Sequence, residues 1–131
     1  MDENLTNMNS PGSSQGILTV QVSEAEKAIP VRDALALVTR DNPDGSVTLY
    51  GVLTTDESGI TPELPLPAPA AGESMTPSNT SPYSIYYVRI SHPGYYTEEN
   101  HMIQVFGDSK SNLRINLIPL PEFPEKDVIS Y

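Results

Sequence analysis

The chain of 131 residues contains no cysteine and no tryptophan, and it has only two histidines. The absence of cysteine excludes a disulfide framework, a thiolate zinc site and a cysteine nucleophile. Stability must therefore come from packing and hydrogen bonding. A chain of this length holds one hydrophobic core, so we expect one domain.

Basic residues are also few. Seven lysines and arginines stand against 17 acidic residues, which gives a formal net charge of −10. The basic residues are scattered along the chain, and an acidic protein repels phosphates. We therefore predict that nucleic acid is not a partner.

Long apolar runs are missing as well. No segment approaches the roughly 20 apolar residues that cross a membrane, so we predict no membrane insertion. Residues 1–16 have neither the basic start nor the apolar centre of a Sec-type signal peptide. A role in a bacterial cell envelope, a spore or the extracellular space would thus require another export route, lysis, or excision from a longer polypeptide.

Catalytic and metal-binding patterns are absent from the sequence. His92 precedes a Pro-Gly turn and His101 follows an acidic run, without a His-x-x-x-His or His-Glu-x-x-His spacing. Asp41, Asp44 and Asp56 lack the ligand ladder of a calcium loop and are better explained as turn residues. No Gly-x-Ser-x-Gly elbow or glycine-rich phosphate loop occurs. We predict no catalytic residue, no cofactor and no metal.

What the sequence does contain is a series of strand signals. Residues 83–96 hold five of the seven tyrosines, and almost every residue of 84–90 is β-branched or aromatic. Pro93-Gly94 ends this strand with a type II turn, and we expect the Tyr95 ring to lie across the end of the fold. Period-2 alternation or turn spacing predicts further strands at 16–23, 34–39, 46–54, 61–66, 101–106 and 112–118.

Turn residues predict how these strands connect. The segment 41–45 should join the second and third strands as a hairpin, and Gly107-Asp108 should join 101–106 and 112–118 as another. We expect Ile29 and Val31 to be tucked into a buried loop. The proline-rich stretch 67–82 is predicted to be a structureless surface insertion.

Together these signals predict an all-β protein, a seven-stranded antiparallel β-sandwich of immunoglobulin-like type with flexible termini. The domain should cover residues 16–121, preceded by a disordered tail at 1–15 and followed by a tail at 122–131. The predicted core residues are Leu18, Val20, Val22, Leu53, Tyr86, Val88, Ile90, Leu113, Ile115 and Leu117.

Five short motifs carry a family resemblance across residues 16–121. They are Gly16-Ile-Leu-Thr-Val-Gln-Val, Ile29-Pro-Val-x-Asp-Ala, Leu53-Thr-Thr-Asp-Glu-Ser-Gly, Tyr86-x-Val-x-Ile with Pro93-Gly-Tyr, and Leu113-x-Ile-x-Leu. In this order they resemble the carboxypeptidase regulatory-like domain, a transthyretin-like (prealbumin-like) sandwich. The subgroup that looks most similar belongs to spore-forming Firmicutes, standing alone or near peptidoglycan-binding modules. The resemblance implies a module without catalysis of its own.

The outward-facing residues of two predicted strands indicate a contact surface. If Tyr86, Val88 and Ile90 point inward, period 2 turns their neighbours outward, and the same holds for the leucines that alternate with Ala34, Ala36 and Val38. An apolar patch of this kind is typical of protein contacts. The covering of the patch by 67–82 or by the tail around Phe123 stays open as an alternative. The predicted interface residues are Leu35, Leu37, Ile85, Tyr87 and Arg89.

The functional prediction follows from these points. We expect a non-enzymatic structural or binding module of a bacterial surface, spore or envelope-associated assembly, acting through a protein partner or self-association. Two alternatives stay open: a metal-assisted hydrolase using His92, His101 and nearby carboxylates, and an accessory domain that binds carbohydrate such as cell-wall peptidoglycan.

Overall fold

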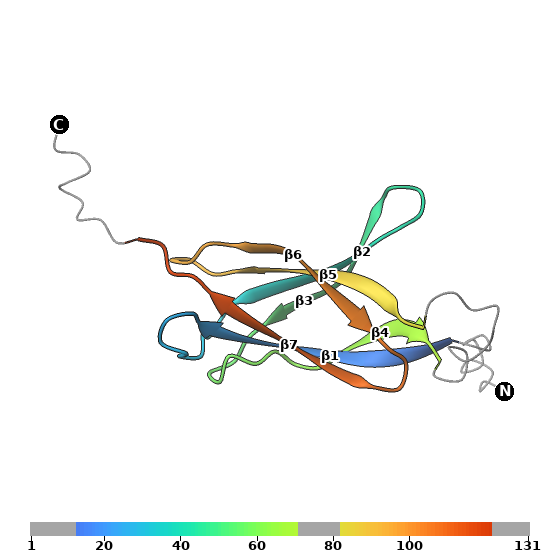
Figure 1. Cartoon of the computed structure of the whole chain (residues 1–131), viewed down its shortest axis with the longest axis horizontal. Helices are drawn as coiled ribbons and strands as arrows, with labels where there is room; N and C mark the ends of the chain where they lie inside the picture. The colour runs from blue at the N-terminus through green and yellow to red at the C-terminus, as the bar shows by residue number, and fades with distance from the viewer. Residues whose placement is uncertain (1–12, 71–81, 122–131) are drawn as a thin grey trace.

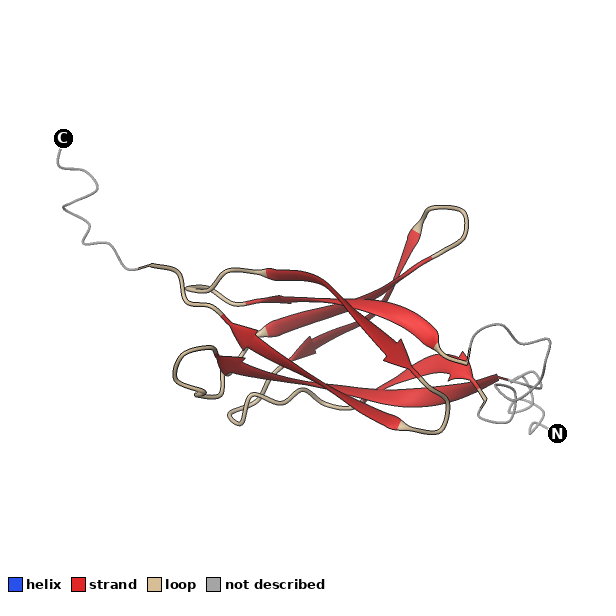
Figure 2. Cartoon of the chain, viewed as in Figure 1, coloured by secondary structure: helices blue, strands red, loops and turns tan. Residues whose placement is uncertain are grey.

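The computed structural model describes residues 13–70 and 82–121, whose regular structure is entirely β-strand (Figure 2). The strands form two layers, a three-stranded sheet in the order β4-β1-β7 and a four-stranded sheet in the order β3-β2-β5-β6 (Figure 1). The predicted seven-stranded sandwich is confirmed. No helix in the described ranges is long and apolar enough to cross a membrane. The strands are β1 (Ser13–Glu24), β2 (Leu35–Asp41), β3 (Val47–Thr54), β4 (Leu64–Pro69), β5 (Ser84–Ser91), β6 (Glu98–Val105) and β7 (Lys110–Leu117).

Four of the strand pairs are antiparallel, as predicted, and the β1–β7 pair is parallel. The predicted hairpin between the last two strands is wrong, because β6 pairs with β5 in one sheet and β7 pairs with β1 in the other. The connection between β6 and β7 forms hydrogen bonds with β1 and does not close a hairpin. Asp108 N–H donates to the Gln15 carbonyl at 2.8 Å, and Ile17 N–H donates to the Ser109 carbonyl at 2.9 Å.

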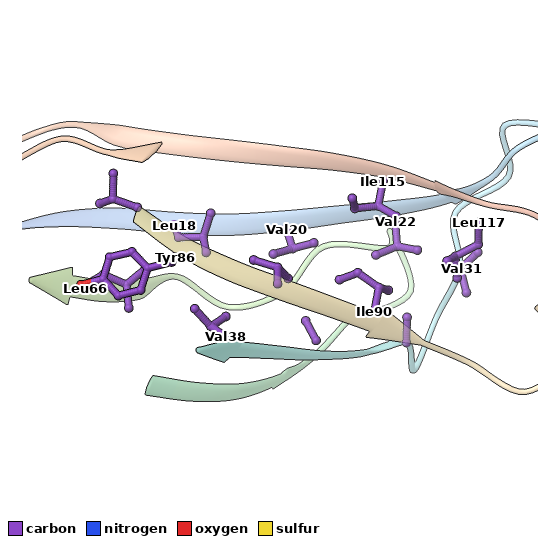
Figure 3. Close-up of a cluster of buried hydrophobic side chains, with 14 of the residues drawn as sticks. Leu18, Val20, Val22, Val31, Val38, Leu66, Tyr86, Ile90, Ile115 and Leu117 are labelled. Atoms are coloured by element: carbon purple, nitrogen blue, oxygen red, sulfur yellow. The ribbon is translucent and has the colours of Figure 1, made fainter. Parts of the chain in front are cut away.

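The core lies between the two sheets and is made by alternate residues of the strands (Figure 3). All of the predicted core residues are buried except Leu53 and Leu113, which are partly buried and pack against the rest. The small side chains Ala34 and Ala36 are also buried, as the strand pattern predicted. The buried hydrophobic residues that were not predicted lie on β4 and β6: Leu66, Ala68 and Val105.

The predicted boundaries need two corrections at β1 and β4. β1 begins at Ser13, so residues 13–15 belong to the sheet and not to a tail; they pair with Pro69, Ala68 and Pro67. β4 runs from Leu64 to Pro69, so the predicted insertion begins as a strand. A proline is tolerated at an edge strand when its missing N–H would point away from the neighbour. The remaining tail residues, 1–12 and 122–131, and residues 71–81 lie outside the described ranges.

The loop between β1 and β2 is only half as predicted. Val31 is buried, and its N–H donates to the Val22 carbonyl at 2.9 Å. Ile29, expected to be buried with it, is 50% exposed. Pro30 lies between them and bridges to Ser23, so the extended backbone turns the two side chains in opposite directions.

Two buried threonines attach the connections to the strands. Thr55 Oγ1 donates to the Val31 carbonyl at 2.6 Å and accepts from Ala34 N–H at 2.8 Å. Thr61 Oγ1 accepts from Val20 N–H at 2.9 Å. Each hydroxyl satisfies backbone groups that would otherwise be buried without a partner.

Candidate interaction surface

The candidate surface is the outer face of the four-stranded sheet, and it is centred on the pair β2 and β5. These strands are direct neighbours, with Leu37 opposite Arg89 and Thr39 opposite Tyr87. Since Ala36, Val38, Tyr86, Val88 and Ile90 are fully buried between the sheets, the alternate residues point to the outside. The structure thus brings the two predicted groups of outward side chains onto one face.

Each predicted interface residue lies on this face. Leu35, Leu37, Ile85 and Tyr87 are half-buried, which means that their neighbours shelter only part of each side chain. Arg89 is exposed, and its Nε lies 3.7 Å from Glu99 Oε1 on β6. The centre of the face is therefore apolar, and one ion pair lies toward its β6 side.

Sequence reasoning missed the apolar residues that extend this face onto the two flanking strands. On β3, Val47 is 59% exposed, and Leu49 and Val52 are each 55% exposed. On β6, Met102 lies opposite Tyr87 and is 53% exposed. Apolar side chains therefore occur on all four strands of this face, with Thr39 between Leu49 and Tyr87.

A bulge in β3 explains why these residues were missed. Val38 pairs with Gly51 and Thr39 with Leu49, so Tyr50 is an extra residue in the ladder. Strict alternation from the inward-facing Leu53 would have placed Val47 and Leu49 inside. The extra residue reverses the alternation and turns both side chains outward. An unpaired residue in a hairpin strand leaves no clear mark in the sequence, and Gly51 is the only local signal.

The tip of the β2–β3 hairpin leaves the sheet and creates a notch at one end of the face. β2 pairs with β5 only as far as Thr39, and in Figure 1 the hairpin tip projects beyond the sandwich. The notch has a volume of about 500 Å³ and is lined by Arg40, Asp41, Pro69, Tyr83, Ser84, Ile85 and Tyr87. A second hollow of about 420 Å³ also includes Asp41 and Tyr87. Tyr87 thus borders both hollows.

Arg40, which lines the notch, contacts Tyr86. Its guanidinium carbon lies 5.3 Å from the centre of the Tyr86 ring, a cation–π distance. The Tyr86 hydroxyl donates to the Pro67 carbonyl at 2.5 Å, and the Tyr50 ring meets the Tyr86 ring edge-on at 5.3 Å. Burial raises the pKa of Tyr86 above its usual value, while the Arg40 charge acts in the opposite direction. The hydroxyl therefore stays protonated as a donor.

The predicted turn at the other end of the sandwich places Tyr95 as expected. Its ring packs against the core and meets the His92 ring edge-on at 5.5 Å. The Tyr95 hydroxyl donates to Glu24 Oε2 at 3.3 Å. Desolvation, followed by the Glu24 charge, raises the pKa of Tyr95.

The histidines and turn aspartates make only local contacts. His101 Nε2 lies 3.0 Å from Glu98 Oε1, and His92 Nδ1 lies 2.7 Å from the Pro93 carbonyl. Asp44 accepts hydrogen bonds from the hydroxyl and N–H of Ser46, which lower its pKa, in that order of size. In the described ranges, no three His, Asp or Glu side chains gather closely enough to hold a metal ion.

Asp56 has a similar role in the turn after β3. Its Oδ1 accepts from Ser58 N–H at 2.8 Å and from Ile60 N–H at 3.0 Å. The Ile60 bond is the largest cause of its lowered pKa. The interpretation of Asp44 and Asp56 as turn residues is confirmed by these contacts. For Asp41 it is wrong, because Asp41 is the last residue of β2 and pairs with Val47 of β3.

Comparison with known proteins finds likeness in structure only. No protein-family model matches the chain, and no curated protein matches it in sequence. Among solved structures, a catechol 1,2-dioxygenase from an Acinetobacter species has a TM-score of 0.58 at 11% identity, over 86% of this chain and 55% of that chain. A 3-chlorocatechol 1,2-dioxygenase from Rhodococcus opacus has a TM-score of 0.57 at 16% identity, over 86% and 62% of the two chains.

A protein of a different kind is equally similar. The minor pilin of Streptococcus agalactiae has a TM-score of 0.57 at 12% identity, over 86% of this chain and 48% of that chain. The chain thus spans less than two thirds of the length of each of these proteins. At such identities the comparisons show a shared sandwich fold, and they do not decide between a catalytic and a structural role.

Proposed function

We propose that this chain is a non-enzymatic structural and binding module that acts through protein–protein contacts at the outer face of its four-stranded sheet. The observation that carries the proposal is the group of apolar side chains around Tyr87, which occur on all four strands of this face in an otherwise acidic chain. Exposed apolar patches rimmed by polar residues are typical of contact sites.

The outer face of the other sheet provides a contrast within the same molecule. There the outward residues of β1 and β7 are polar except for the half-buried Ile17, and several bond to one another: Thr19 Oγ1 donates to Asn112 Oδ1 at 3.1 Å, and Asn112 Nδ2 donates to Gln21 Oε1 at 3.4 Å. Arg114 and Asn116 continue this polar surface along β7. The two faces are exposed to the same solvent, so the difference in polarity supports a partner for the apolar one.

The finer assignment draws on the resemblance of the sequence motifs to the carboxypeptidase regulatory-like domain. It supports a module without catalysis, in a bacterial surface, spore or envelope-associated assembly. Similar folds occur in a pilin and in dioxygenases. The proposal therefore rests on the surface of this chain and not on the fold.

Charge placed at the centre of the face tests the proposal. In Tyr87→Asp a carboxylate replaces the anchor, and we expect it to abolish a complex in which the Tyr87 face is buried, because a desolvated carboxylate in an apolar contact is costly. The control is Asn112→Asp, which adds the same charge to the opposite face and should leave the complex intact. Light scattering measures self-association, and affinity capture followed by cross-link mapping measures whether a partner contacts the Tyr87 face.

Two outcomes would contradict the proposal. One is a wild type that stays monomeric at high concentration and captures no partner through this face. The other is hydrolysis of peptides or glycans by the pure protein that is lost when a single polar residue is changed. Binding of peptidoglycan unaffected by Tyr87→Asp would favour the carbohydrate-binding alternative.

A further inference from the structure

The edges of the two sheets differ in how well they are protected against pairing with another strand. An open edge displays free N–H and C=O groups, and proteins protect such edges with prolines or charged residues. In the described part of the chain the edge strands are β4 and β7 in one sheet, and β3 and β6 in the other. β6 carries Glu98 and Glu99, and β7 carries Lys110 and Arg114.

β4 is protected by proline at every second position. Its even-numbered residues carry the N–H groups that can bond to β1, where Leu66 pairs with Gly16. Pro65, Pro67 and Pro69 occupy the positions whose backbone points outward, and proline has no N–H. The outer edge of β4 therefore has carbonyl groups but no donors, which prevents a regular ladder with another strand.

β3 has neither form of protection. Its eight residues, Val47–Thr54, include no proline and no charged side chain. The direction of its backbone groups follows from the bonds at its ends, where Asn42 N–H donates to the Ser46 carbonyl and Thr55 N–H donates to the Ala34 carbonyl. The N–H and C=O groups of successive residues point to opposite sides of a strand, and the bulge at Tyr50 interrupts this alternation once. Counted from each end of β3, the N–H and C=O groups that point away from β2 belong to Val47, Leu49, Val52 and Thr54.

We propose that β3 pairs in antiparallel fashion with β3 of a second copy of this chain, so that two four-stranded sheets join into one. The bulge at Tyr50 separates the outward groups into two pairs, and a two-fold axis at the bulge places Leu49 opposite Val52 and Val47 opposite Thr54 of the other copy. Every outward donor and acceptor then faces another. On the apolar face, the side chain of Leu49 then meets Val52 of the other copy, and Val47 meets Thr54.

The charge of the molecule favours a second copy at this edge over contact elsewhere. Two chains of net charge −10 repel one another, so they associate best where neither strand carries a charge. β3 is the edge strand that meets this condition and also keeps its N–H donors. This inference goes beyond the proposed function, since it names a second copy as partner and the β3 edge as the contact, and it can fail while the Tyr87 face still binds another protein.

Amide hydrogen exchange distinguishes strand pairing from docking of the faces. We expect the amide protons of Leu49, Val52 and Thr54 to exchange about tenfold more slowly at protein concentrations well above the dissociation constant than in dilute solution. The outer-edge amides of β6 serve as the internal reference and should not change. Sedimentation velocity over the same concentrations gives the oligomeric state.

Val52→Pro places a proline at an outward position of β3, as the prolines of β4 are placed. The substitution removes an outward donor at an exposed position and leaves the bonds to β2 in place, so the variant should stay folded and monomeric. Val52→Lys, which puts a charge on the edge without a backbone change, should have the same effect. Asn112→Asp, on the far face, should dimerise like the wild type.

Three results would overturn the inference. A wild type that is monomeric at all concentrations up to about 1 mM would exclude even a weak pairing. A dimer whose β3 amides exchange as they do in the monomer would place the contact elsewhere. Dimerisation that persists in both Val52→Pro and Val52→Lys would exclude the β3 edge, whereas capture of a different protein through the Tyr87 face would leave the proposed function in place.

Discussion

At the scale of single residues, the turn after β3 depends on the glycine at position 59. Gly59 has φ of +76° and is buried, and a Cβ at this position would collide with the Val22 carbonyl oxygen. Gly59→Ala should lower the free energy of unfolding by about 2–4 kcal/mol, the sum of a left-handed backbone and a steric clash. Urea denaturation measures the change.

Gly94→Ala is the matched control for this prediction. Gly94 also has a positive φ, of +91°, but a Cβ there would meet nothing within 4 Å. Only the backbone cost of about 1 kcal/mol should appear. Equal losses in the two variants would mean that the contact with Val22 has no energetic role.

The sequence predicted turn glycines of this kind better than it predicted buried polar residues. Gly59 and Gly94 follow strand patterns directly, so their turns could be predicted from neighbouring residues. Nothing near Thr55 indicates that its hydroxyl bonds to Val31 and Ala34, because those partners lie more than 20 residues away and are brought together only by folding. The outward direction of the five predicted interface residues could be predicted because period 2 is a local property, whereas the pairing of β2 with β5 that brings them onto one face could not.

At the scale of elements, strand positions could be predicted and strand partners could not. Alternation marks a strand wherever it lies, but pairing depends on contacts made after collapse. The segment at Gly107 is an example, since it reads as a hairpin turn and yet bonds to β1. The bulge at Tyr50 is another, because it inverts the faces of half a strand and Gly51 is its only local sequence signal. The extent of the candidate surface was therefore underestimated on β3.

The hydrogen bond from the Tyr86 hydroxyl on β5 to the Pro67 carbonyl on β4 makes the stability of the fold depend on pH in the alkaline range. Tyr86 is fully buried, its hydroxyl donates to Pro67, and its pKa is raised mainly by burial. Above pH 10 the unfolded chain releases this proton while the folded chain retains it, so stability falls as pH rises, by at most about 1.4 kcal/mol per pH unit for one group. Tyr86→Phe should remove this part of the slope, at a cost near pH 7 of about 1–2 kcal/mol for the lost hydrogen bond.

Urea denaturation between neutral pH and pH 11 measures both effects. Tyr95→Phe is the comparison, since the pKa of Tyr95 is also raised but its hydroxyl bonds to Glu24 at the edge of the fold. We expect the larger reduction in slope for Tyr86→Phe. An unchanged slope in that variant would show that other groups cause the loss of stability at high pH.

At the scale of the whole molecule, the described part of the sandwich has a mostly polar outer face on β1 and β7, an outer face with apolar side chains on the other sheet, and the edge strand β3, which is uncharged and keeps its N–H donors. These features fit an acidic protein that stays dispersed except where a partner can dock without meeting a charge. The proposed pairing of β3 has one unfavourable feature. Antiparallel register brings the turn at Asp44 of one copy close to the turn at Asp56 of the other, and hydrogen bonds keep the pKa of both carboxyls low.

The repulsion between these turns predicts that salt strengthens the dimer. The screening length falls from about 10 Å at 0.1 M salt to about 3 Å at 1 M, so the dissociation constant should decrease several-fold over that range. Asp44→Asn/Asp56→Asn keeps the turn acceptors and removes the charges, and it should tighten the dimer at low salt and flatten its salt dependence. Glu26→Gln/Asp108→Asn removes as much charge away from β3 and should preserve most of the dependence. Sedimentation velocity provides the measurement, and a dimer that weakens with salt would instead indicate a contact made by ion pairs, which β3 cannot supply.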